Sequence, residues 1–148
     1  MKNKSIKNIR YPLILISISL WISGFRWLVS SEPWMLDQVA NEERLQMTFI
    51  NLFLIDWNYS LSAYLTQIYR FLGLYVLGIG FSLVSFTSKK FLKIDSFRQR
   101  FLIVLGILLV SNLVLAYVWI PSSHFIYVMW GAIALFCFSL YNHLNIKK

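Results

Sequence analysis

The sequence contains few residues that could form crosslinks or bind a metal. It has a single cysteine, Cys137, and two histidines, His124 and His143. One cysteine excludes an intrachain disulfide, and no cluster of Cys and His has the spacing of a zinc or haem site. The sequence also has no nucleophile elbow, phosphate loop or metalloprotease signature. We therefore expect no metal and no cofactor, and the sequence favours a protein that is not an enzyme.

Charged residues are also scarce, at 14% of the chain against 58% hydrophobic residues. A soluble domain of this composition would expose large apolar patches to water, so the chain is expected to form one integral membrane domain over residues 1–148. The net charge of +8 does not indicate nucleic acid as a partner, because the basic residues flank apolar runs. Membrane lipid is the expected partner instead.

Four apolar runs are long enough to cross a bilayer, which requires about 20 residues. The clearest run extends from Phe71 to Ser88 without a charge, between Arg70 and a pair of lysines. The first run could also be a cleaved signal peptide, but it is longer than an ordinary signal sequence and contains Arg26. The sequence predicts an all-α integral membrane four-helix bundle. Its spans are expected at about 11–30, 64–88, 101–120 and 125–141.

The connection between the first two spans, residues 31–63, is long and contains five of the six acidic residues. Its second half, residues 45–57, is apolar but too short to span a membrane. This pattern predicts a short interfacial or re-entrant helix between spans 1 and 2. Helical spacing would place one set of side chains on its membrane-facing side. These are Leu45, Phe49, Leu52 and Phe53.

The distribution of basic residues predicts the orientation in the membrane. Four of the 14 lysines and arginines precede the first span, five lie in residues 89–100 and two end the chain, so eleven lie on one side. Loops rich in Lys and Arg remain in the cytoplasm. We therefore expect a cytoplasmic loop at 89–100, both termini in the cytoplasm and residues 31–63 outside.

Small residues in the second span predict where it packs. Gly73 and Gly80 are seven residues apart and share one face of the helix, whereas Gly78 lies on another. Small residues allow two membrane helices to approach closely. Gly73 and Gly80 are thus expected to face a neighbouring helix, and Gly78 to face a second neighbour or another copy of the chain.

The polar residues of the spans indicate a candidate ligand site near the outer side. Ser23 and Arg26 belong to a polar stripe on span 1, and Arg70 is expected at a similar depth on span 2. Arginines within a membrane need a partner, a wet cavity or access to headgroups. They could be neutralised by acids such as Asp56, or they could line an outward-facing pocket for an anionic or polar ligand. Asn112 and His124 are further candidates for this pocket.

The run Arg70, Gly73, Gly78 and Gly80, together with four spans and cytoplasmic ends, resembles small bacterial membrane proteins of the DoxX-like type. This resemblance implies a multi-pass protein of the bacterial inner membrane, in a group of which some members are linked to quinone-dependent oxidoreductase complexes. We expect an accessory or small-molecule-binding subunit with a lipid or quinone-like ligand, in a homo-oligomer or a larger complex. A small oligomeric transporter, or an enzyme acting on lipid or quinone, are the alternatives.

Overall fold

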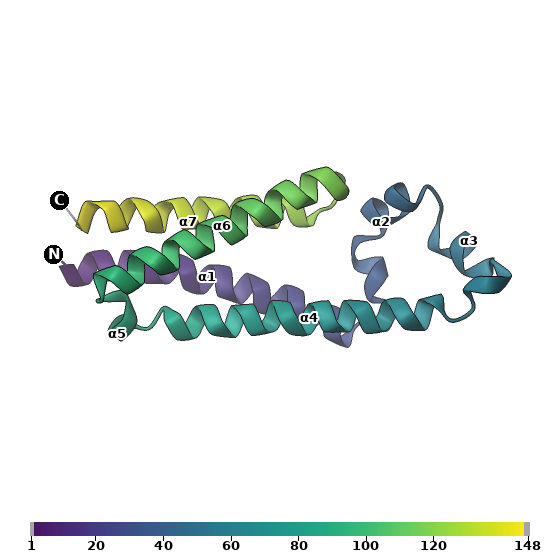
Figure 1. The fold of residues 1–148 in the computed structure, drawn as a ribbon, viewed down its shortest axis with the longest axis horizontal. Helices are drawn as coiled ribbons and strands as arrows, with labels where there is room; N and C mark the ends of the chain where they lie inside the picture. The colour runs from purple at the N-terminus through teal and green to yellow at the C-terminus, as the bar shows by residue number, and fades with distance from the viewer. Residues whose placement is uncertain (1, 147–148) are drawn as a thin grey trace.

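The computed structural model describes residues 2–146, with side chains from Ser5 onwards, and all its regular elements are helices. Four helices are long and apolar enough to cross a membrane, which confirms the predicted all-α four-helix architecture. They run side by side along one axis, and both ends of the chain lie at the same end of the bundle (Figure 1). The four are α1 (Lys2–Val29), α4 (Leu61–Phe86), α6 (Asp95–Trp119) and α7 (Phe125–Ile146).

Short elements occupy the two ends of the bundle. The end that carries both chain termini and residues 89–100 is called the basic end here, and the opposite end is called the loop end. At the basic end, α5 (Lys89–Leu92) joins α4 to α6. At the loop end, four short helices follow α1 (Figure 1). They are η1 (Pro33–Asp37), α2 (Gln38–Leu45), α3 (Phe49–Leu54) and η2 (Asp56–Asn58).

Several helices extend beyond the predicted spans. Helix α6 begins at Asp95 rather than near residue 101, and α7 runs to Ile146 rather than 141. The spans were placed by the length of each apolar run. A helix makes its backbone hydrogen bonds within itself, so it can continue beyond the apolar run into polar surroundings. The predicted spans match the long helices in number and order, and three of these helices continue past the predicted limit at the basic end, whereas α4 ends at Phe86, two residues before it.

Helices α1 and α4 pack closely through small residues, as predicted for Gly73 and Gly80. A Cβ atom on Gly73 would lie 2.7 Å from the carbonyl oxygen of Gly24, and a Cβ on Gly24 would lie 2.7 Å from the carbonyl oxygen of Gly73. A Cβ on Gly80 would lie 2.6 Å from the ring of Trp21. By contrast, a Cβ on Gly78 would meet no atom within 4 Å. The prediction for Gly73 and Gly80 is confirmed, and Gly24 completes the contact, whereas a contact of Gly78 with another copy of the chain stays a prediction.

The core is divided along the bundle axis. Near the basic end, buried side chains of all four long helices form one cluster around Leu13, Leu83, Leu105 and Ala132. Towards the loop end, a separate cluster contains only residues of α6, α7 and their junction, around Leu113 and Ile126. The four helices thus share a core at one end, whereas α6 and α7 have a core of their own at the other.

The predicted helix at 45–57 is shorter than expected. Leu45 ends α2, and Gln46 follows it in the left-handed conformation with φ 56°. The hydroxyl of Thr48 then accepts a hydrogen bond from the Asn51 amide and caps α3, which ends at Leu54. The expected membrane-facing side was also wrong, because Phe49 is buried. Its ring lies 6.3 Å from Trp34 and 5.8 Å from Phe53, so this side of α3 packs on the connection itself.

Candidate functional site

A lateral groove of about 830 Å³ lies between α4 and α6. The two helices meet at the basic end, where the ring of Phe86 lies 6.0 Å from Phe97 and 6.3 Å from Phe101. From there α6 runs away from α4 towards the loop end (Figure 1). Because no other long helix fills the space between them on this side, the groove opens sideways. Its lining includes Leu74, Tyr75, Gly78, Ile79, Ser82, Leu83, Phe86, Phe97, Arg100, Phe101, Val104, Leu105 and Leu108.

The floor of the groove is part of the core, and its rim is apolar. Leu83 and Leu105 line the groove and also belong to the buried cluster at the basic end, so the floor is fixed by the packing of all four helices. Gly78 lies at the rim and leaves open space where another residue would place a side chain. The groove therefore has a rigid floor and room for an apolar chain.

The basic end of the groove carries a charge. Arg100 lines the groove and is exposed, and among residues 2–146 no acid forms an ion pair with it. Ser82 supplies a hydroxyl to the same lining. The site thus combines a long apolar surface with a cation at one end, which is the distribution of polarity in an amphipathic molecule.

Arg98, only two residues before Arg100, has a different role. Its side chain is 1% exposed and uses each of its nitrogens. Nε donates to Nδ1 of His143 at 2.8 Å, Nη1 donates to the carbonyl of Leu92 at 2.6 Å, and Nη2 forms an ion pair with Asp95. These contacts join α5, α6 and α7. Arg98 is a structural residue that closes the basic end of the bundle.

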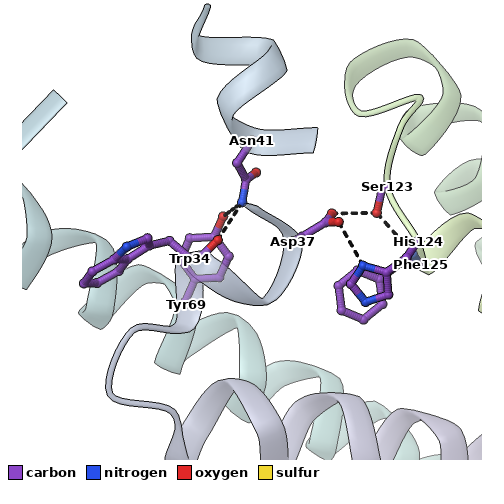
Figure 2. A network of polar contacts seen from close by, with 7 residues as sticks. All are labelled: Trp34, Asp37, Asn41, Tyr69, Ser123, His124 and Phe125. Atoms are coloured by element: carbon purple, nitrogen blue, oxygen red, sulfur yellow. Dashed lines mark hydrogen bonds and ion pairs between the residues drawn. The ribbon is translucent and has the colours of Figure 1, made fainter. Parts of the chain in front are cut away.

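At the loop end, residues 33–45, which form η1 and α2, connect α4 to the turn between α6 and α7. We call this segment the bridge. Towards α4, the amide of Asn41 donates to the hydroxyl of Tyr69 at 3.0 Å. Towards the turn between α6 and α7, the carboxylate of Asp37 accepts from Ser123 Oγ at 2.6 Å and from His124 Nδ1 at 3.1 Å (Figure 2). Asp37 and Ser123 are buried. The bridge therefore fastens α4 to the α6–α7 turn by polar contacts.

Two further contacts fasten the bridge to the same turn. Glu43 accepts a hydrogen bond from Ser122, and the guanidinium of Arg44 lies 4.7 Å from the ring centroid of Trp119. All four partners are exposed, so these contacts contribute less than the buried Asp37 pair.

The structure places the predicted pocket residues on α1 and α4 at one level but does not join them to Asp56. Gly24 touches Gly73, so Arg26 and Arg70 lie at similar heights on antiparallel helices, as expected. Both are exposed, and within the described chain neither forms an ion pair. Asp56 precedes α4, whereas Arg70 lies nine residues inside it, about 13 Å along the axis. This separation explains why Asp56 does not neutralise them.

The other predicted site residues lie apart. Ser23 is half-buried on α1, and the amide of Asn112 is exposed on α6 and donates to the Leu108 carbonyl of its own helix at 2.7 Å. His124 contacts Asp37 of the bridge. No hydrogen bond or ion pair within residues 2–146 joins any of the six candidates to another. The outward-facing pocket at Arg26 and Arg70 therefore stays a prediction.

Three features of the site were not predicted from the sequence. Arg98 is one of five basic residues in the predicted loop at 89–100, and nothing in the sequence indicates that its role differs from that of Arg100. Asp37 is one of five acids in the long connection, and its partners lie 86 and 87 residues away. The groove arises from the divergence of α4 and α6. The only feature of the described sequence that pointed to this groove was the face of span 2 containing Gly78. That face was expected to meet a second neighbour or another copy of the chain.

The fold has the four apolar helices of a multi-pass membrane protein, and its lateral groove is apolar with Arg100 at one end. Comparison with protein-family models, with curated proteins and with solved structures gave no match. The resemblance to the DoxX-like type accordingly stays a prediction, and the functional argument rests on the residues of the site.

Proposed function

We propose that this protein is a multi-pass subunit of the bacterial inner membrane that binds a lipid in the groove between α4 and α6. The observation that carries the proposal is the groove itself, an apolar surface that opens sideways and ends at the guanidinium of Arg100, which forms no ion pair with the described residues. In a bilayer such an opening faces the acyl chains directly, so a lipid can enter it without leaving the membrane.

The length of the groove fits one leaflet. Its α4 wall runs from Leu74 to Phe86, which lie about 18 Å apart along the axis at the rise of an α-helix. Half of the hydrocarbon core of a bilayer is about 15 Å thick. A lipid of the leaflet at the basic end would thus lie along the groove for the whole length of its chains, with its polar part at Arg100.

We propose binding rather than a reaction because the groove lacks the groups that catalysis needs. The described lining contains no carboxylate and no imidazole that could act as a general base. A bound lipid there would serve as a structural or regulatory component of a larger membrane complex, which is the accessory role expected from the sequence.

Filling the groove tests the proposal directly. Gly78→Trp places an indole in the open space at the rim, and Gly131→Trp on α7 is the matched control, because a Cβ at either glycine meets no atom within 4 Å. Native mass spectrometry of protein extracted in mild detergent should show co-purified lipid on the wild type and on Gly131→Trp. Gly78→Trp should lose it while keeping its melting temperature. Equal lipid content in both variants would overturn the proposal.

The proposed orientation, with both termini in the cytoplasm, has a separate test. It rests on the eleven basic residues on one side of the spans. A reporter enzyme that is active only outside the cytoplasm should be silent after Lys148 and active when inserted near Glu42. The reverse pattern would place the basic end, and the leaflet that supplies the lipid, on the other side.

A further inference from the structure

We infer that the lipid in the α4–α6 groove is a glycerophospholipid with a net negative headgroup, held by Arg100 at its phosphate and by Ser82 at an ester carbonyl. This inference rests on the proposed function and specifies its ligand. It follows from two polar side chains in the groove, from their relative depth and from the charge around them.

Arg100 is the residue suited to the phosphate. Arg98 is buried and fully engaged with Leu92, Asp95 and His143, but Arg100 projects into the groove lining without an acidic partner in the described chain. A guanidinium offers two parallel N–H donors, and this geometry matches the oxygens of a phosphate. Arg98 therefore stabilises the fold, whereas Arg100 is available to contact the ligand.

Ser82 differs from Ser85 and Thr87, the two small hydroxyl residues that follow it at the end of α4. Ser85 returns its hydrogen bond to the Phe81 carbonyl at 2.9 Å, and Thr87 returns its own to Val84 at 2.8 Å. The hydroxyl of Ser82 has no hydrogen-bond partner within the described residues, although it lines the groove. A hydroxyl in an apolar lining without a partner is ready to donate to a ligand carbonyl.

The depths of the two groups match the order of polar groups in a glycerophospholipid. Phe86 packs between Phe97 and Phe101, so it marks the level of Arg100 on the opposite wall. Ser82 lies one helical turn deeper, about 6 Å along α4. In a glycerophospholipid the ester carbonyls lie beneath the phosphate, between it and the chains. The guanidinium and the hydroxyl therefore meet these groups in the correct order.

The surrounding charge favours an anionic headgroup over a zwitterionic one. Lys89, Lys90 and Lys93 are exposed at the basic end, and Arg10 is held there by a hydrogen bond to the Thr87 carbonyl at 3.1 Å. Among the described residues 89–100 the one acid is Asp95, which is engaged by Arg98. Clustered Lys and Arg at a membrane surface attract anionic lipids.

The test compares lipids that differ only in the headgroup or only in the ester. Purified full-length protein is titrated with phosphatidylglycerol and phosphatidylcholine of identical chains, and bound lipid is counted by native mass spectrometry. Wild type should bind phosphatidylglycerol severalfold more tightly, because the basic residues at this end of the bundle repel the choline cation of phosphatidylcholine. Arg100→Gln should weaken binding of both lipids by about tenfold, the effect of one charge-assisted pair, because both carry the phosphate. Lys93→Gln, which removes one charge outside the groove, should leave binding of phosphatidylcholine nearly unchanged and lower the preference for phosphatidylglycerol.

The second arm addresses Ser82. Ser82→Ala should weaken binding of the diester lipid by a fewfold and leave the ether-linked analogue, which lacks the carbonyls, unchanged. If Arg100→Gln and Lys93→Gln weaken binding of phosphatidylcholine equally, the phosphate contact is overturned. If wild type binds the two lipids equally, the anionic headgroup is overturned, and if Ser82→Ala acts equally on both analogues, the carbonyl contact is overturned. In that case lipid loss in Gly78→Trp would still support the groove. If Gly78→Trp keeps its lipid, the proposed function itself fails.

Discussion

The basic end and the loop end of the bundle are held together in different ways. At the basic end, all four long helices contribute to one buried cluster, and Arg98 ties α5, α6 and α7 together from inside. At the loop end, α6 and α7 have their own cluster, and the bridge connects them to α4 by a few polar contacts. The difference indicates that separation of α4 from α6 and α7 begins at the loop end, because a few polar contacts and the ring contact of Trp27 with Phe125 are weaker than a core shared by all four helices.

Tight backbone contact between α1 and α4 extends along both halves, and breaking it should have the largest effect. Gly73→Leu would force the helices apart, because even a Cβ would lie 2.7 Å from the Gly24 carbonyl. We expect a loss of about 3 kcal/mol in the free energy of unfolding, seen as a lower melting temperature in detergent. Gly78→Leu should change it little. Equal effects of the two substitutions would show that the glycine contact does not form.

Replacing the buried Arg98 should have the second-largest effect on the free energy of unfolding. Arg98→Met removes the three contacts of the guanidinium, and we expect a loss of about 2 kcal/mol. Adding His143→Leu should recover part of this loss, because replacing both members of a buried polar pair by apolar residues costs less than removing one of them. Arg100→Met is the control and should be nearly neutral. A loss in Arg100→Met as large as in Arg98→Met would contradict the structural role given to Arg98.

The bridge should give the smallest and most local effect. Asp37→Asn weakens the bonds to Ser123 and His124, and we expect a loss of about 1 kcal/mol. Hydrogen exchange measured by mass spectrometry should become faster in residues 33–45 and 119–126 and stay unchanged in residues 95–105. Faster exchange at the basic end as well would show that the two halves open together and that the comparison above is wrong.

Some of this organisation could be predicted from the sequence, and the reason is physical. The number of spans follows from the apolar length that a bilayer demands, and the roles of Gly73, Gly78 and Gly80 follow from helical periodicity alone. Both depend on residues close together in the chain, so a single sequence contains the information.

The contacts between distant residues could not be predicted in this way. Arg98 meets His143 across 45 residues, and Asp37 meets His124 across 87. Nothing in the local pattern distinguishes these residues from other basic or acidic residues nearby. The groove depends on the angle between α4 and α6, which is set by packing over the whole bundle. The short helix predicted within 45–57 is present as α3, but its predicted exposed side was wrong for a related reason, because that side is covered by Trp34 from earlier in the connection.

The separate cluster of α6 and α7 has a consequence for the order of assembly during synthesis. These two helices are joined by a short turn, and Leu113, Ala116 and Ile126 form a cluster to which no buried hydrophobic residue of α1 or α4 in the described chain belongs. Helix α1, in contrast, finds its glycine partner on α4 only after the connection of residues 30–60 has been made. Contacts between residues near in sequence form faster than distant ones. The last two helices can therefore insert as a preformed hairpin, which then docks its basic end onto an α1–α4 pair already in the bilayer.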